Sequence, residues 1–508
     1  MTNQTSDNNK RIAKNTLLLY IRMIFIMLIN LYTSRVILQA LGVKDYGIYN
    51  VVGGFVAMFG LISNSLSAAI TRFITFELGT GNKDKLNKIF SSSVTIQLAI
   101  SLIIVIAVEI VGIWFVNNKM VVEPERLVAA NWCLQLSMIT FCFNIIAVPY
   151  NALIIAHEKM AAFAYISVFE AVLKLVVCFL VMLSSSDKLV CYAILLSVVA
   201  LLIRTIYGIY CRRHFEESKY HFYFDKSLLL KMFAFSGWNF IGAGAGVLRE
   251  QGVNVLINVF WGTTLNASRG IAQQVSAAVT SFSSSFISAV NPQITKSYAA
   301  DDKEQSFQLV IHGARLSYYL LLLISLPVFL ETPILLRVWL TVVPDYCVAF
   351  VRLTLLYVMM ESLSYTMMTL MLASGRIKNY QLIVGGLQLL NFPISYLLLW
   401  LGCTPDYTYI AAIIIAIACL FVRLILLNQM TGLSIPEYFK KVILNVILVS
   451  IIGALLPIAI IYYMNESFAR LFITVGISTI SLFLTYVFVG CNRQERKYII
   501  TKIKDRIQ

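Results

Sequence analysis

The sequence predicts an all-α polytopic membrane protein with about 14 transmembrane helices. Of its 508 residues, 59% are hydrophobic and only 13% are charged, whereas a soluble protein carries roughly 25% charged residues. The apolar residues occur in blocks of about 20, the length that crosses the hydrocarbon core of a bilayer. One long stretch of the sequence also occurs twice, which is typical of transporters.

The repeated stretch covers residues 35–85, and its second copy lies 220 positions later, as the spacing between Gly42 and Gly262 shows. Other matched pairs are Ser63 with Ser283, Ser65 with Ser285, Thr75 with Thr295, and Lys83 with Lys303. In each copy an apolar run ends in a short turn that contains glycine. A long helix rich in small residues follows, and a hydrophilic loop closes the copy. This duplication predicts two homologous halves.

The apolar runs place the expected spans along the chain. They cover residues 16–40, 46–71, 89–116, 127–153, 160–183, 189–211, 232–260, 264–290, 315–337, 346–371, 380–402, 407–427, 441–463 and 469–489. Glycine, serine or threonine interrupts the second, eighth and tenth of these runs.

The distribution of lysine and arginine predicts that both termini lie in the cytoplasm. With that orientation, most basic residues fall in cytoplasmic segments. The other face then holds only Lys44, Lys119, Arg126, Lys188, Arg269, Arg337 and Arg470. Topology and contact with anionic lipids in the bilayer therefore account for most of the net charge of +15. Nucleic-acid binding is not predicted.

Cysteine and histidine do not indicate a metal site or a cofactor. The nine cysteines are scattered without a Cys-x-x-Cys pair, and they are expected to pack as small apolar residues. None of the four histidines has a metal-ligand spacing to another ligand. The external loops are short and lack histidine.

Ionisable residues deep inside spans are the candidates for function, because a charge there is costly unless it faces a cavity or a partner. In the first span, Arg22 shares a polar stripe with Asn30 and Thr33. Arg35 lies nearer the end of that span, where an interfacial position competes with contact to a substrate.

The seventh span carries a second deep arginine, Arg249, next to Glu250. Asn239, Glu250 and Asn254 form a stripe on the same helix, with Arg249 beside it. Because the first and seventh spans are equivalent in the repeat, each half has an arginine within its first helix.

Three acidic residues, Glu170, Glu250 and Glu361, are candidates for binding a coupling ion. Glu170 lies four residues before Lys174, the better orientation for an ion pair on a helix, so self-neutralisation competes with function there. Glu361 has no partner three or four residues away, which predicts an isolated carboxylate that exchanges protons.

Three motifs resemble the polysaccharide-flippase branch of the multidrug/oligosaccharidyl-lipid/polysaccharide exporter superfamily. They are LGVKDYGIYN at 41–50, NASRGIAQQ at 266–274 and SGRIKNYQ at 374–381. The resemblance extends from about Lys14 to Arg493 and implies two pseudo-symmetric six-helix lobes around a central cavity, followed by two more helices. The expected domains are lobes at 1–211 and 232–430, a cytoplasmic linker at 212–231, two C-terminal helices at 431–490 and a cytoplasmic basic tail at 491–508.

The resemblance implies a cargo of oligosaccharide linked to undecaprenyl diphosphate. Such a flippase moves its cargo from the cytoplasmic to the periplasmic leaflet of the bacterial inner membrane. Relatives have cationic cavities, and Arg22 and Arg249 match the role of their arginines. The expected substrate-binding residues are Arg22, Arg249, Lys174, Asn30, Asn239 and Arg35. O-antigen, capsule and exopolysaccharide remain alternatives for the glycan, and other membrane proteins of polysaccharide assembly are expected partners.

Two other functions remain alternatives. A cation-coupled multidrug antiporter of the same superfamily typically needs a carboxylate in its first helix, whereas here no Asp or Glu lies between Lys14 and Ala40. A membrane polysaccharide polymerase or ligase usually carries catalytic residues on large external loops, and the expected external loops are short.

Overall fold

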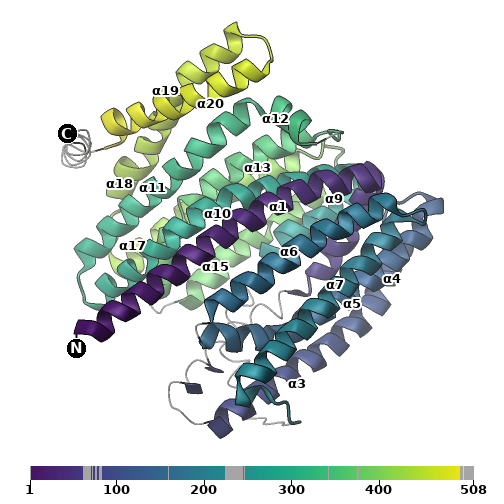
Figure 1. The fold of residues 1–508 in the computed structure, drawn as a ribbon. Helices are drawn as coiled ribbons and strands as arrows, with labels where there is room; N and C mark the ends of the chain where they lie inside the picture. Colours follow the sequence, from purple (N-terminus) through teal and green to yellow (C-terminus); the bar gives the residue numbers. More distant parts are fainter. Residues whose placement is uncertain are drawn as a thin grey trace. The chain divides into compact units, whose positions relative to one another are not determined.

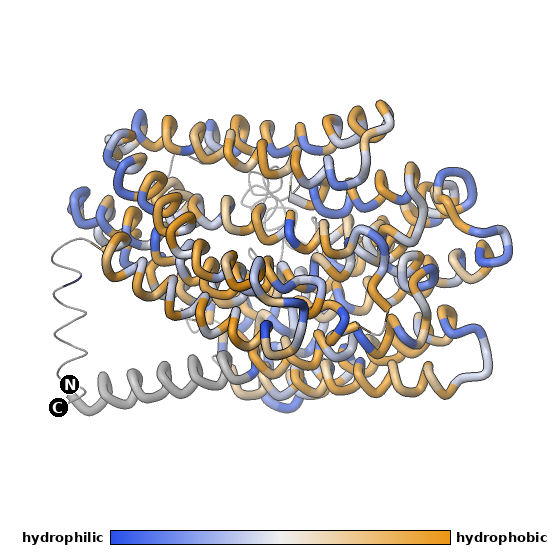
Figure 2. Tube along the Cα trace, turned by 90° about the horizontal axis from the view of Figure 1, so that it is seen from above, coloured by the Kyte–Doolittle hydropathy of each residue, from blue (hydrophilic) through white to orange (hydrophobic). Residues whose placement is uncertain are grey.

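The computed structural model describes most of the chain and shows that it is helical. It describes residues 2–60, 70, 73–74, 77–78, 83–157, 159–222, 244, 246–340, 342–374, 377–491 and 496. These residues form helices and turns and contain no β-strand. Eleven helices in this part are long and apolar enough to cross a membrane. Figure 2 shows hydrophobic residues along the helices and hydrophilic ones in many connecting turns. The all-α polytopic fold is therefore confirmed, while the count of 14 spans is not.

The chain divides into two compact units. The first comprises Met1–Gly270 with Leu399–Leu401, and the second comprises Ile271–Leu398 with Gly402–Gln508. Arg22 and Arg249 both belong to the first unit. The lobe boundaries at 211 and 232 stay predictions.

The first unit is a bundle in which α5 packs against α3 and α7, while α1 packs along α6 (Figure 1). Its elements are α1 (Thr2–Ala57), α3 (Lys83–Ala107), the π-helical turn η1 (Val108–Gly112), α4 (Ile113–Asn118), η2 (Pro124–Arg126), α5 (Leu127–Ala156), α6 (Met160–Leu183), α7 (Lys188–His214), η3 (Glu216–Ser218), the π-helical turn η4 (Leu248–Gly252), α9 (Val253–Trp261) and the start of α10 (Thr263–Ala299).

The second unit is built on α11, which packs against α13, α14, α19 and α20. Its elements after α10 are α11 (Lys303–Leu330), α12 (Thr332–Trp339), α13 (Cys347–Ser362), α14 (Tyr365–Ala373), α15 (Ile377–Leu389), α16 (Asn391–Trp400), α17 (Tyr407–Thr431), α18 (Ile435–Tyr438), η5 (Phe439–Ile443), α19 (Leu444–Tyr463), α20 (Phe468–Thr485) and η6 (Tyr486–Gly490). The predicted pair of C-terminal helices corresponds to α19 and α20, which pack against each other.

The 220-residue repeat is confirmed at two places in the backbone. Gly42 interrupts α1 with φ 77° and ψ 169°, so α1 consists of two helices joined at this glycine. Gly262 separates α9 from α10 with φ 81° and ψ −178°. Both copies therefore join two helices at a glycine with a positive φ and an extended ψ.

The two glycines give a matched stability prediction. Alanine at Gly42 or Gly262 should lower the free energy of unfolding by about 1–3 kcal/mol, because a positive φ combined with an extended ψ is a backbone conformation that essentially only glycine adopts. An added Cβ at Gly42 meets nothing within 4 Å, and at Gly262 the nearest atom is Val121 Cγ1 at 3.8 Å. The unfavourable backbone conformation alone therefore causes the expected loss of stability. Thermal unfolding in detergent should show a similar destabilisation in both variants.

The control for this prediction is Gly53→Ala within α1. The added Cβ there also meets nothing within 4 Å, and Gly53 has no positive φ. Alanine favours a helix relative to glycine, so this variant should unfold no earlier than the native protein. Equal destabilisation of all three variants would contradict the special role of the two turns.

Arg126 ties three elements of the first unit together. Its Nε donates to Asp45 Oδ1 of α1 at 2.9 Å, and its Nη2 donates to Asp187 Oδ1 at 3.1 Å. Asp187 also caps the start of α7, because its Oδ1 accepts from the Leu189 backbone N–H at 3.0 Å. The hydrogen-bonded Arg126 guanidinium lowers the pKa of the Asp187 carboxyl. This arrangement fixes α1, α5 and α7 at one end.

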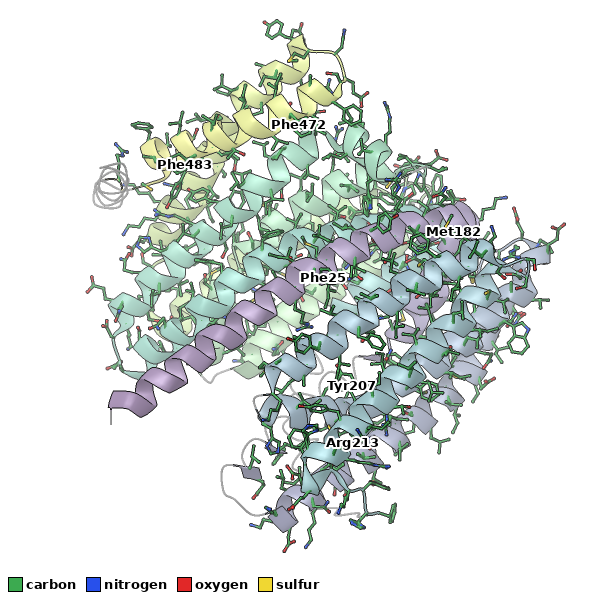
Figure 3. The ribbon with its side chains drawn as sticks, viewed as in Figure 1. Phe25, Met182, Tyr207, Arg213, Phe472 and Phe483 are labelled. Carbon is green, nitrogen blue, oxygen red and sulfur yellow. The ribbon has the colours of Figure 1, made fainter. Side chains whose placement is uncertain are left out.

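A buried ion pair fastens α20 to the rest of the second unit. Glu331, between α11 and α12, is fully buried. Its two carboxylate oxygens accept from Nε and Nη2 of Arg470 at 3.0 and 2.8 Å. Thr474 also donates to Glu331, at 2.9 Å. Elsewhere on α20 the side chains of Phe472 and Phe483 are exposed (Figure 3).

Candidate functional site

Arg22 lies where α1 packs against α6. Its guanidinium carbon is 4.5 Å from the centre of the Phe163 ring on α6, a cation–π geometry. The side chain is half-buried, and its Nε is buried without a hydrogen-bond partner in the described part of the chain. A buried N–H of a charged group that lacks an acceptor is costly, so this atom favours binding of an oxygen ligand.

Glu170 and Lys174 of α6 extend the surroundings of Arg22. Lys174 Nζ donates to Glu170 Oε1 at 2.6 Å, which confirms the predicted pair on one helix. Glu170 and Tyr207 of α7 are electrostatic neighbours of Arg22. Figure 3 marks Tyr207 on α7. We call Arg22, Phe163, Glu170, Lys174 and Tyr207 the α1–α6 cluster. Its two cations and one carboxylate leave one net positive charge, which suits an anionic ligand.

The other polar residues of the first span differ in environment. Asn30 is exposed, and its carbonyl accepts from Ser34 Oγ at 2.6 Å. Thr33 has a buried hydroxyl that lacks a partner among the described residues. Arg35 is half-buried and has an interaction partner of its own. Arg22 and Thr33 thus each have a buried polar atom without a hydrogen-bond partner among the described residues, whereas Asn30 is exposed.

Arg249 and Glu250 lie in the π-helical turn η4. Arg249 Nη2 is 3.1 Å from Glu250 Oε1, and the side chains are 17% and 44% exposed, respectively. A π-helical turn is an energetically unfavourable local geometry that is frequently found at functional sites. The repeat does not match the two arginines residue by residue, because the equivalent of Arg249 is the buried Ile29.

Arg269 stabilises this turn, a role that the sequence does not indicate. It lies within α10, in agreement with the span predicted at 264–290. Its Nη2 donates to the backbone carbonyls of Arg249 at 3.3 Å and Glu250 at 2.9 Å. The π-helical turn disrupts regular backbone pairing, and a fixed guanidinium compensates for this. Arg269 belongs to the NASRGIAQQ motif, the one sequence signal that marks it.

We expect Arg269→Met to lower the free energy of unfolding by about 1.5–3 kcal/mol, which is the contribution of a hydrogen bond to a charged group. Thermal unfolding in detergent is the measurement. Arg269→Lys should restore part of the lost stability. As a control, Arg204→Met removes an arginine that donates to the Tyr150 hydroxyl. An equal loss of stability in the Arg204→Met control would show that Arg269 has no special effect on η4.

Asn254, which the sequence places on a stripe with Glu250, has a hydrogen-bond partner in α1. It is buried, and its Nδ2 donates to the Asn50 carbonyl of α1 at 3.1 Å. Asn266 of α10 donates in turn to the carbonyl oxygen of Asn254 at 2.7 Å. These amides join α1, α9 and α10 and so have a packing role. The predicted site residue Asn239 lies outside the described residues.

Glu361 lies in the second unit, one residue before the end of α13. It is half-buried and has an interaction partner. The expectation of an isolated carboxylate is therefore wrong. The helix ends here, and α14 begins at Tyr365 after a short break.

The sequence matches the family model described as polysaccharide biosynthesis protein over residues 12–298, more than half of the chain. No curated protein sequence matches it.

Several solved membrane transporters have a similar fold. The lipid II flippase MurJ in an inward closed conformation is 14% identical, with a TM-score of 0.65 over 93% of this chain and 98% of that chain. An inward-facing multidrug resistance MATE family transporter of the MOP superfamily is 13% identical, with a TM-score of 0.66 over 81% and 98%. A MOP superfamily transporter from Pyrococcus furiosus, described as having a binding pocket of reverse polarity, is 11% identical, with a TM-score of 0.61 over 83% and 96%. At these identities the likeness shows the fold alone.

Proposed function

The chain belongs to the polysaccharide biosynthesis protein family, and from this premise we propose that it is a flippase for oligosaccharide linked to undecaprenyl diphosphate. It moves this cargo from the cytoplasmic to the periplasmic leaflet of the bacterial inner membrane, with both of its own termini in the cytoplasm. The fold that it shares with MurJ and MATE transporters supports a transporter.

The single observation that carries this proposal is the unpaired Nε of Arg22 within a cluster of net positive charge. An isolated ion in hydrocarbon costs on the order of tens of kcal/mol, so a diphosphate does not cross a bilayer unaided. A fixed guanidinium offers planar donors that match two phosphate oxygens. Phe163 and the α1–α6 contact hold it in place.

The remaining candidates have supporting roles in this proposal. Arg249 is the second cation for the diphosphate, and Lys174 keeps the carboxylate of Glu170 from neutralising Arg22. Asn30, Asn239 and Arg35 are further contacts to the cargo. Glu361, Glu250 and Glu170 are the candidates for a proton or sodium ion whose gradient resets the transporter.

The experiment that tests this proposal is deletion of the gene in a bacterium that makes the polysaccharide. The mutant should lose surface polysaccharide and accumulate the lipid-linked oligosaccharide, and a plasmid copy should restore export. Normal export in the deletion mutant would contradict the proposal. Efflux of cationic dyes by the purified protein, without any effect on lipid-linked sugar, would instead favour a multidrug antiporter.

A further inference from the structure

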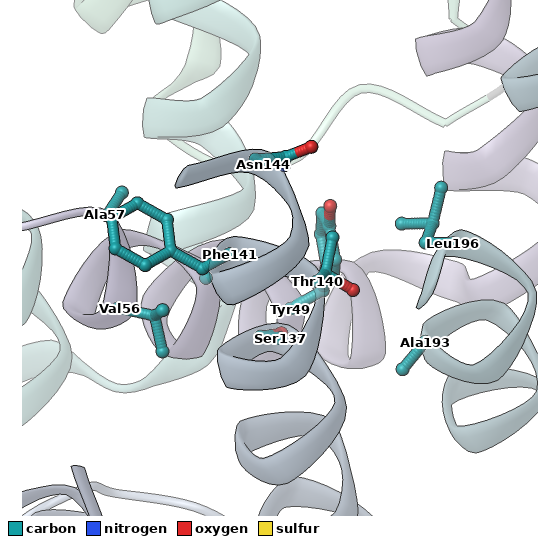
Figure 4. A pocket seen from close by; sticks show the side chains of 10 residues that line it. Tyr49, Val56, Ala57, Ser137, Thr140, Phe141, Asn144, Ala193 and Leu196 are labelled. Carbon is teal, nitrogen blue, oxygen red and sulfur yellow. The ribbon is translucent and has the colours of Figure 1, made fainter. Parts of the chain in front are cut away.

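A small polar pocket lies within the first unit, between α1, α5 and α7 (Figure 4). Its volume is about 160 Å³. Figure 4 shows Thr140 and Asn144 on α5, with Leu196 of α7 across from them. The lining also includes Tyr49 and Phe141. None of these groups belongs to the α1–α6 cluster or to η4.

The walls of this pocket are held by contacts of lining residues with neighbours outside it. The hydroxyls of Thr140 and Ser197 are 2.8 Å apart, which joins α5 to α7. The ring of Tyr49 packs edge-on against that of Tyr192, with 5.0 Å between the ring centres. The pocket therefore exists before any ligand arrives, which lowers the cost of binding.

Asn144 is an exposed amide in the lining of this pocket. It lies near the middle of α5, it is exposed, and no partner for its amide is found among the described residues. Ser137, Thr140 and Asn144 follow one another at three and four residues and so share one helix face. An amide that faced hydrocarbon at this depth would leave its donors and acceptor unsatisfied at considerable cost. We therefore expect the mouth of the pocket to face water or cargo.

We propose that this pocket binds one uncharged sugar ring of the lipid-linked glycan, an inference that rests on the proposed function. An engineered protein cavity of about 150 Å³ binds benzene, so a pocket of about 160 Å³ takes up part of one pyranose, with the remaining hydroxyls at its mouth. No charged residue lines the pocket, so an ion would enter it without a counter-charge. Hydroxyl and amide groups can donate and accept hydrogen bonds, as sugar hydroxyls require. Tyr49 and Phe141 add apolar ring faces for the C–H side of a pyranose.

The pocket and Arg22 thus divide the recognition of the cargo. The guanidinium binds the phosphate, which is common to all such lipids. The uncharged pocket recognises a sugar ring, and the identity of that sugar differs between glycans. This division places specificity for the glycan in α5, at Asn144.

The test measures binding of free monosaccharides to the whole protein in lipid nanodiscs by saturation-transfer NMR. The probes are glucose, galactose, N-acetylglucosamine and N-acetylgalactosamine at millimolar concentration. At least one sugar should receive saturation at its ring protons, and Asn144→Leu should weaken that binding about tenfold, as expected for one lost hydrogen bond. Asn118→Leu is the matched control, because Asn118 is exposed outside the pocket and bonds to the carbonyl of Trp114 in its own helix.

Two results would overturn this inference: no sugar binds, or Asn144→Leu binds as the native protein does. Export in cells separates this failure from failure of the proposed function. If no sugar binds while the deletion mutant loses export, the pocket proposal is wrong and the flippase stands. If a sugar binds through Asn144 while deletion leaves export unchanged, the pocket binds sugar and the flippase proposal is wrong.

Discussion

Arg22→Ala is expected to abolish export of the polysaccharide while the protein remains folded and inserted. A charge-assisted hydrogen bond contributes about 1.5–3 kcal/mol, and a bidentate guanidinium makes two of them. Removal of the side chain should therefore slow flipping about 100-fold or more, given that 1.4 kcal/mol is tenfold. Surface polysaccharide, normalised to the amount of protein in the membrane, is the measurement.

Two variants make this result specific. Arg22→Lys keeps the charge but loses the planar pair of donors, so it should retain intermediate activity. Arg213→Ala removes an exposed arginine from the last turn of α7 and should export normally. Normal export by Arg22→Ala would show that this cation does not hold the diphosphate.

The second large effect is on stability, and it concerns the buried pair of Glu331 and Arg470. Arg470→Met should destabilise the protein by about 3–5 kcal/mol, because it leaves an uncompensated carboxylate in the interior. The side chains of Glu331 and Arg470 are 0% and 11% exposed, so water cannot replace the lost partner. A lower melting temperature in detergent is the expected result.

The double variant Glu331→Gln, Arg470→Met distinguishes the buried charge from lost packing. With no charge left in the interior, it should recover much of the stability of the native protein. Arg337→Met provides a surface control, because the pair of Arg337 with Glu466 is 66% and 34% exposed and should contribute little. Unchanged melting of Arg470→Met would mean that the pair does not fasten α20.

Much of the fold follows from local sequence patterns. The apolar runs predict the helices because bilayer thickness sets their length. The repeat predicts matched turns, and Gly42 and Gly262 do adopt the same backbone conformation, with a positive φ and an extended ψ. The pair of Glu170 and Lys174 also follows from helix geometry, since four residues bring side chains onto one face.

The features that depend on tertiary packing could not be predicted in this way. Glu331 and Arg470 are far apart in sequence, and no periodicity links them. The π-helical turn at Arg249 has no composition signal, and its contact with Arg269 depends on how α10 packs. Ser137, Thr140 and Asn144 are spaced to share one face of a helix. The pocket also needs walls from α1 and α7, which spacing within one helix does not specify.

The most direct test of the central idea, a fixed cation that carries a lipid diphosphate across the membrane, is a flipping measurement in proteoliposomes. Undecaprenyl-diphosphate-linked oligosaccharide is reconstituted with the protein, and a membrane-impermeant reagent that modifies the glycan reports which leaflet holds it. Native protein should make the inner-leaflet glycan accessible over time, whereas Arg22→Ala should behave like liposomes without protein. Equal rates for the native protein and Arg22→Ala, or no acceleration by the native protein, would contradict the account.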